Sequence, residues 1–129
     1  RTGEQPDDKR VAWQYTKGTG YVLSNILYGD YVYLSTDNGI MTCLDAKTGQ
    51  PVLEQTRLPG LDSIYASPVA ADGRIYFIGR NGTAITIKDS PSLEVLATNK
   101  LDEPIAASPV FANGVLYLRS FDALYAVKN

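Results

Sequence analysis

Side chains that commonly carry out catalysis are scarce in this sequence. It contains no histidine and one cysteine, Cys43, among 129 residues. The lack of histidine excludes Ser-His-Asp and Cys-His arrangements, histidine-ligated zinc and a histidine general base. A single cysteine cannot form a Cys-x-x-Cys site. Gly18-Thr19-Gly20 lacks the strand-to-helix context of a phosphate-binding loop. The sequence therefore predicts no catalytic residue, no metal site and no cofactor.

Composition and charge narrow the classes of partner. Hydrophobic residues make up 44% and charged residues 20%, which is typical of a folded globular chain. The net charge of −2 comes without a basic patch, so we expect no nucleic-acid partner. No apolar stretch approaches the roughly 18–20 residues of a membrane span. The mixed charges of residues 1–10 predict a flexible N-terminal segment.

A repeat is the main structural signal. Residues 24–34, 67–77 and 108–118 align, and their first serines lie 43 and 41 positions apart. A period of about 40–45 residues with strand-like content is typical of a β-propeller, in which each repeat forms one four-stranded blade. We predict an all-β domain over residues 11–129, with about three four-stranded antiparallel blades at residues 24–58, 67–101 and 108–127.

Turn residues support this division into strands. Asp72-Gly73 and Asn113-Gly114 occupy the same place in two repeats and suit two-residue hairpins, because both positions can adopt positive φ. The continuous apolar runs 31–34 and 75–78 suit strands that are buried on both faces. A β-sandwich of short strands is the alternative fold. The period and the repeated Ser-Pro-Val start count against it.

One turn motif resembles a known family. Cys43-Leu44-Asp45-Ala46-Lys47-Thr48-Gly49 is similar to the blade motif of pyrroloquinoline-quinone-enzyme-like propellers, which outer-membrane assembly lipoproteins and other secreted bacterial propellers share. The resemblance implies a propeller fold and a periplasmic or secreted location in the bacterial envelope. It does not imply a quinone cofactor, because the adjacent cysteines of the quinone enzymes are absent. Asp45 and Gly49 are interpreted as turn residues.

Closure of a ring needs more than this chain. Three blades fall short of the four to eight that form a closed propeller. We therefore expect either self-association or further blades in a longer protein. Residues 11–16, which include Trp13, are predicted to form a strand that completes the last blade, since closure removes an exposed edge.

Loops at one end of the blades are the predicted binding surface. They join the fourth strand to the next first strand, and the second strand to the third. Rigid scaffolds often carry function on such loops, although solvated loop residues without a function are the competing interpretation. The candidate binding residues are Tyr21, Asp62, Tyr65, Arg80, Asp102, Glu103 and Asp122.

The function predicted from these features is non-catalytic. We expect a binding or scaffolding module whose partner is a protein, a peptide or a saccharide. The alternative is that the chain forms the C-terminal blades of a quinone-dependent dehydrogenase whose catalytic residues lie upstream. A third hypothesis is a purely structural assembly unit.

Overall fold

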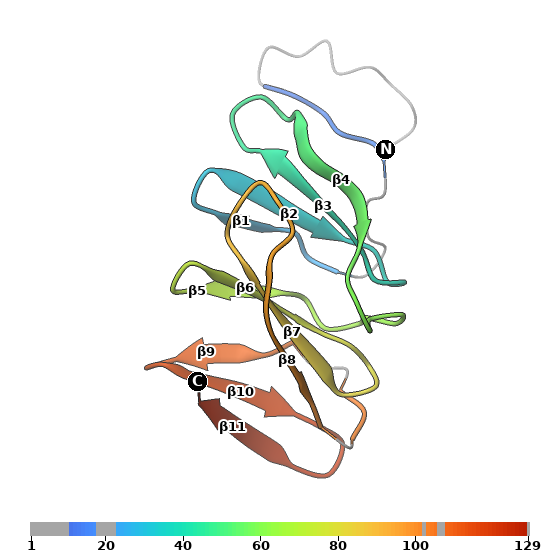
Figure 1. Ribbon diagram of the computed structural model, residues 1–129, viewed down its shortest axis with the longest axis vertical. Helices are drawn as coiled ribbons and strands as arrows, with labels where there is room; N and C mark the ends of the chain where they lie inside the picture. The colour runs from blue at the N-terminus through green and yellow to red at the C-terminus, as the bar shows by residue number, and fades with distance from the viewer. Residues whose placement is uncertain (1–10, 18–22, 102, 106–107, 129) are drawn as a thin grey trace.

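The predicted all-β fold is confirmed. The computed structural model describes residues 11–17, 23–101, 103–105 and 108–128. In this part of the chain, eleven β-strands form three antiparallel sheets, and no helix is present. Figure 1 shows the three sheets following one another along the long axis of the molecule.

Each sheet corresponds to one sequence repeat and is called a blade below. The first blade contains β1 (Ile26–Tyr28), β2 (Tyr31–Ser35), β3 (Ile40–Asp45) and β4 (Pro51–Arg57). The second contains β5 (Val69–Ala71), β6 (Arg74–Ile78), β7 (Thr83–Lys88) and β8 (Val95–Lys100). The third contains β9 (Val110–Ala112), β10 (Val115–Arg119) and β11 (Leu124–Lys128). In each blade, neighbouring strands follow one another in the chain, so every blade is a simple meander.

The hairpin turns follow the chemistry of their residues. Asp72 and Gly73 have φ values of 54° and 73°, and Asn113 and Gly114 have φ values of 53° and 76°. Asn, Asp and Gly tolerate this left-handed conformation better than other residues, and two-residue hairpins require it. The first two strands of the second and third blades are therefore paired in a fixed register by their turns.

The blade motif acts as a turn device. The Asp45 Oδ1 atom accepts hydrogen bonds from the N–H groups of Lys47 (2.9 Å) and Thr48 (3.1 Å). Gly49 has a φ of 73°, and its N–H donates to the carbonyl oxygen of Asp45. Each group thus supports the reversal between β3 and β4, which accounts for these residue types without a catalytic role.

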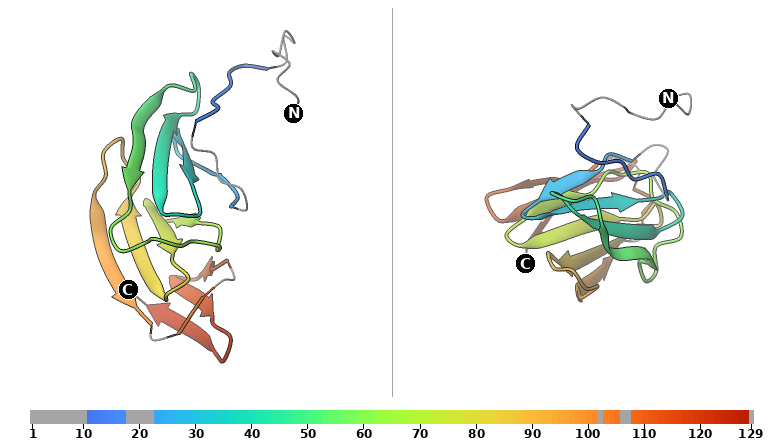
Figure 2. Two further views of the ribbon diagram at one scale, coloured as in Figure 1. Left: turned by 90° about the vertical axis from the view of Figure 1, so that its right-hand side faces the viewer. Right: turned by 90° about the horizontal axis from the view of Figure 1, so that it is seen from above.

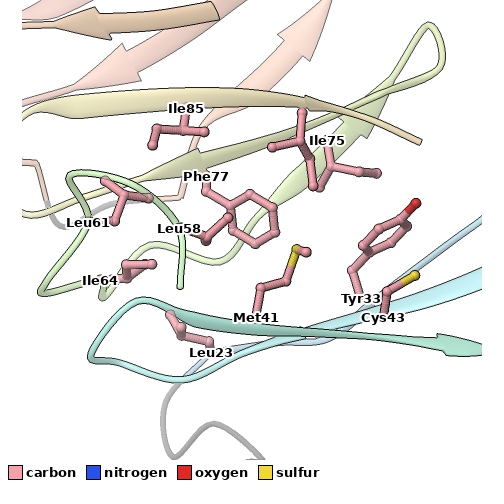
Figure 3. Close-up of a cluster of buried hydrophobic side chains, with 11 residues drawn as sticks. Leu23, Tyr33, Met41, Cys43, Leu58, Leu61, Ile64, Ile75, Phe77 and Ile85 are labelled. Carbon is pink, nitrogen blue, oxygen red and sulfur yellow. The ribbon is translucent and has the colours of Figure 1, made fainter. Parts of the chain in front are cut away.

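Apolar side chains between the blades form the core. One cluster joins the first and second blades, and Figure 3 shows Tyr33, Met41 and Cys43 facing Ile75 and Phe77 across that junction. A second cluster joins the second and third blades. Full burial of a side chain such as Phe or Ile contributes about 1.5–3 kcal/mol. Stacking of the blades is therefore the main source of stability.

The N-terminal segment differs from the prediction. Residues 11–16 form no strand, and they lie against the first blade rather than the third. The indole N–H of Trp13 donates to the Ala46 carbonyl (2.9 Å), and the Tyr15 hydroxyl donates to Glu54 (2.9 Å). A Cβ on Gly49 would lie only 2.5 Å from the indole, so this glycine leaves room for the ring. The first blade thus provides an acceptor for the indole N–H and a packing surface for the apolar ring of Trp13.

The division into domains stays a prediction. Residues 1–10, predicted to be flexible, lie outside the described residues. Figure 2 shows β4 and β8 along one side of a curved stack of blades, which is the arrangement expected of outer strands.

Candidate functional site

A row of loops at one end of the three blades forms the candidate site. Backbone hydrogen bonds connect the loops in sequence. The Ile64 N–H donates to Asp37 (2.7 Å), the Arg80 N–H to Ser63 (2.8 Å) and the Ile105 N–H to Arg80 (2.9 Å). The last two blades are joined further by a β-bridge between Ile105 and Ser120. The loops therefore form one connected surface.

The loop between β4 and β5 alternates buried and exposed side chains. Leu61, Ile64 and Ala66 are buried and anchor the loop. Asp62 and Tyr65 are exposed between them. Because apolar anchors fix the loop from below, its exposed side chains are presented from a rigid backbone.

Tyr65 and Arg80 are brought into contact. The Arg80 guanidinium carbon lies 4.6 Å from the centroid of the Tyr65 ring. Both side chains are exposed, and Tyr65 retains 44% of its surface. A cation–π contact of this kind at an exposed site contributes about 0.5–1 kcal/mol and orients both groups. Of the predicted binding residues, these two form the best-defined pair.

Glu103, on the loop before β9, is hydrogen-bonded to side chains of the third blade. One carboxylate oxygen, Oε2, accepts hydrogen bonds from the hydroxyls of Ser120 (2.5 Å) and Tyr125 (2.6 Å). The bonds from Ser120 and then Tyr125 hold the pKa of the Glu103 carboxyl below its usual value. The side chain links the loop before β9 to β10 and β11, so its geometry is that of a structural acceptor.

The turn between β10 and β11 places two exposed side chains at the same end of the molecule. Asp122 is exposed, and its N–H donates to the Ser120 hydroxyl (3.2 Å). Phe121 beside it is 76% exposed. The sequence prediction did not single out Phe121 as a binding residue. The sequence signal that could have identified Phe121 is an aromatic residue in a short turn, at the place where the other two repeats have Asn-Gly.

Two predicted binding residues cannot be placed. Tyr21 and Asp102 lie outside the described residues. The structure thus locates Asp62, Tyr65 and Arg80 on adjoining loops, Glu103 on the loop before β9, and Asp122 on the turn between β10 and β11. Whether these residues contact a ligand stays a prediction.

The groups closest to a reactive arrangement lie in the core. The Tyr33 hydroxyl of the first blade donates to Asp89 of the second. Burial raises the pKa of Tyr33 well above its usual value, and burial raises the pKa of Cys43 to about 11. Cys43 is fully buried, so its thiol is protonated and inaccessible at neutral pH. This cluster joins two blades and offers no nucleophile to a substrate.

Metal and membrane features were also considered. Within the described ranges, no group of three or more Asp, Glu or Cys side chains could hold a metal ion. The same part of the chain contains no helix with the length and apolarity needed to cross a bilayer.

The fold defines the class of the chain as β-propeller blades. No family model matches the sequence. The chain is 27% identical over 117 residues to the outer membrane protein assembly factor BamB of Burkholderia pseudomallei. This match covers 89% of the chain and 29% of that protein, so the chain spans less than a third of the length of this curated relative.

Solved structures show the same fold. The crystal structure of BamB from Moraxella catarrhalis superposes with a TM-score of 0.72 at 21% identity, covering 91% of this chain and 36% of that one. The computationally designed Ika4 protein superposes with a TM-score of 0.63 at 13% identity, covering 81% and 63%. The predicted resemblance to propellers of outer-membrane assembly proteins is confirmed. The curated relative is named as an assembly factor, in agreement with the prediction of a non-enzyme.

Proposed function

We propose that this chain is a non-catalytic module that binds a protein partner through its row of loops. The observation that carries the proposal is the exposed Tyr65–Arg80 pair, which backbone hydrogen bonds hold at the junction of two blades. Tyr and Arg are enriched among residues that dominate binding energy at protein interfaces. Phe121 adds exposed aromatic surface at the same end.

The curated relative suggests the kind of partner. It is named as an outer membrane protein assembly factor, and the chain corresponds to 29% of its length. We propose by this likeness that the partner is a protein of outer-membrane assembly and that the chain functions in the bacterial envelope. The partner's identity is the part of this proposal that rests on the likeness alone.

The other functions receive less support. A quinone-dependent dehydrogenase is not favoured, because the relatives found are not named as such enzymes. No comparison supports a saccharide ligand. A purely structural role does not explain why the Tyr65–Arg80 pair is exposed on anchored loops. Exposed aromatic surface of this kind more often marks an interaction site.

Capture of partners from solubilised bacterial envelope protein tests the proposal. The immobilised chain should retain a protein of the outer-membrane assembly machinery. Tyr65→Ala and Arg80→Ala should each weaken that binding at least about tenfold, because loss of a dominant interface residue costs about 2 kcal/mol or more. Lys47→Ala is the matched control, since Lys47 is exposed in the turn between β3 and β4, at the other end of the blade.

The outcomes separate the hypotheses. Equal binding by Tyr65→Ala, Arg80→Ala and Lys47→Ala would move the site away from the loops. Retention of no assembly protein by the folded wild-type chain would contradict the proposed partner class.

A further inference from the structure

Three Asn-Gly pairs give this chain sites at which its own backbone can modify a side chain. They are Asn38-Gly39, Asn81-Gly82 and Asn113-Gly114. In such a pair, the backbone nitrogen of the glycine can attack the side-chain amide of the asparagine, because glycine has no Cβ to hinder the approach. The three pairs share this chemistry, so their surroundings in the fold decide which of them reacts first.

The reaction, deamidation, needs only water and a backbone that can move. The glycine N–H loses its proton to hydroxide, and the nitrogen forms a bond to Cγ of the asparagine. The bond from Cγ to the amide nitrogen breaks, and that nitrogen takes a proton from water and leaves as ammonia. Water then opens the succinimide ring at either of its carbonyl carbons, which gives aspartate or isoaspartate. A hydrogen-bonded glycine N–H or a packed turn slows the first step, because it must be released before the ring can form.

The turns of the first two pairs restrain their glycines. The Gly39 N–H donates to the Thr36 carbonyl (3.0 Å), and the Gly82 N–H donates to the Gly79 carbonyl (3.1 Å). Both Gly39 and Gly82 are buried. A Cβ on Gly39 would lie 1.7 Å from a carbonyl oxygen of the loop after β4, and one on Gly82 would lie 2.3 Å from a carbonyl oxygen of the loop after β8. Neither backbone can therefore rotate without moving an adjoining loop.

The asparagine side chains of the same two pairs are also held. The Thr36 hydroxyl donates to Oδ1 of Asn38. The Thr83 N–H donates to Oδ1 of Asn81 (3.0 Å). Rotation of either side chain toward its glycine nitrogen would break a hydrogen bond. Each of these two pairs is thus restrained both at the attacking nitrogen and at the amide that it would attack.

Asn113-Gly114 lacks these restraints. The pair forms the hairpin turn between β9 and β10, and both residues are exposed. A Cβ on Gly114 would meet no atom within 4 Å. Among the described residues, the Gly114 N–H donates to no backbone carbonyl, and the Asn113 side chain makes no hydrogen bond. Only this pair can form the ring without first releasing a bond to a neighbouring group.

The equivalent turn of the second blade, which has a blade on either side, is open in the same way. Asp72 and Gly73 are exposed, and a Cβ on Gly73 would meet no atom within 4 Å. One contact differs between the two turns: the Gly73 N–H donates to the Tyr28 hydroxyl of the preceding blade (2.7 Å). Ala71 has the place in the second repeat that Tyr28 has in the first, and it brings no hydroxyl to Gly114.

We propose that Asn113 is a modification site, at which the folded chain deamidates ahead of Asn38 and Asn81. Aspartate at this position fits the turn, because Asp72 adopts a φ of 54° where Asn113 has 53°. Isoaspartate places an extra methylene group in the backbone of a two-residue hairpin, so it disturbs the register of β9 and β10, which this turn sets. Either product adds one negative charge to the third blade.

Peptide mapping by mass spectrometry after incubation in mildly alkaline buffer tests the proposal. In the folded chain, Asn113 should deamidate at least about tenfold faster than Asn38 or Asn81, because loss of even one hydrogen bond raises a barrier by about that factor. The chain unfolded in urea is the control. There the three rates should be similar, since a β-branched residue follows each glycine. Reaction of Asn38 or Asn81 in the folded chain as fast as that of Asn113 would overturn the proposal.

A matched pair of variants isolates the role of the glycine N–H. Asp72→Asn creates a fourth Asn-Gly pair, in a turn of nearly the same backbone conformation as that of Asn113. Its deamidation should be about tenfold slower than that of Asn113, because the Tyr28 hydroxyl accepts from the Gly73 N–H. Adding Tyr28→Phe should raise the rate to that of Asn113, with circular dichroism to check that both variants are folded. Equal rates with and without Tyr28→Phe would show that this N–H does not control the reaction, and would overturn the proposal.

Discussion

Glu103 shows how a loop carboxylate can serve the scaffold. Its Oε2 atom accepts hydrogen bonds from Ser120 and Tyr125, and these bonds favour the ionised form. Its pKa is therefore lower in the folded chain than in the unfolded chain. The resulting stabilisation is present above the unfolded-state pKa, and it is lost as the pH falls through the folded-state value.

The pH dependence of stability tests this role. Glu103→Gln keeps the shape of the side chain and removes its charge. The variant should melt below the wild-type chain at pH 7, and the difference should shrink as the pH falls below the usual range for glutamate. Thermal unfolding at a series of pH values measures the difference. If the gap remains constant from neutral to acidic pH, the ionised carboxylate does not stabilise the third blade.

At the residue scale, the sequence predicted positions better than contacts. The loops that carry Asp62, Tyr65 and Arg80 were identified from the turn residues that delimit the strands. The contact between Tyr65 and Arg80 was not predicted, because it depends on how two loops 15 positions apart pack together. The role of Glu103 was missed for the same reason: its donors, Ser120 and Tyr125, lie on other elements.

At the element scale, two glycines of similar backbone conformation provide a comparison. Gly39 and Gly73 have φ values of 84° and 73°. A Cβ on Gly39 would lie 1.7 Å from the carbonyl oxygen of Leu61, whereas a Cβ on Gly73 would meet no atom within 4 Å. The first glycine is therefore required by both conformation and space, and the second by conformation alone.

Substitution of these glycines should separate the two effects. Gly73→Ala should lower the free energy of unfolding by about 1–2 kcal/mol, the cost of a left-handed residue with a side chain. Gly39→Ala should lower it by a further 1–3 kcal/mol or so, because the loop that contains Leu61 must move. Urea denaturation measures both changes. Equal losses would show that this loop yields freely and does not form a rigid base for Asp62 and Tyr65.

The N-terminal segment shows the limit of strand prediction from sequence. Residues 11–16 have the alternation and aromatic content of an outer strand, but a strand needs a partner edge. Within the chain, the Trp13 indole N–H donates to the Ala46 carbonyl, and the ring packs against Gly49 of the first blade. The alternation of residues 11–16 thus indicated a segment able to pair with a strand edge, but it could not determine which blade the segment contacts.

At the scale of the whole molecule, the repeat was sufficient to predict the fold. Serines 43 and 41 positions apart and Asx-Gly turns with positive φ specify successive blades of the same hairpin pattern. Tyr33, Tyr76 and Tyr117 occupy equivalent positions in β2, β6 and β10. Tyr33 and Tyr76 pack between blades, whereas Tyr117 is partly exposed because no blade follows it in the described chain. The burial of a residue in one repeat depends on the adjacent blade, which the sequence of that repeat alone does not specify.

The central claim is that equivalent faces of successive blades are buried by stacking. It is tested most directly by comparing the variants Tyr33→Ala, Tyr76→Ala and Tyr117→Ala. Urea denaturation should show losses of about 3–5 kcal/mol for the first two variants, or complete unfolding. Tyr117→Ala should lose less than about 1 kcal/mol, as exposed substitutions do. Similar losses at all three positions would contradict the stacking of these blades.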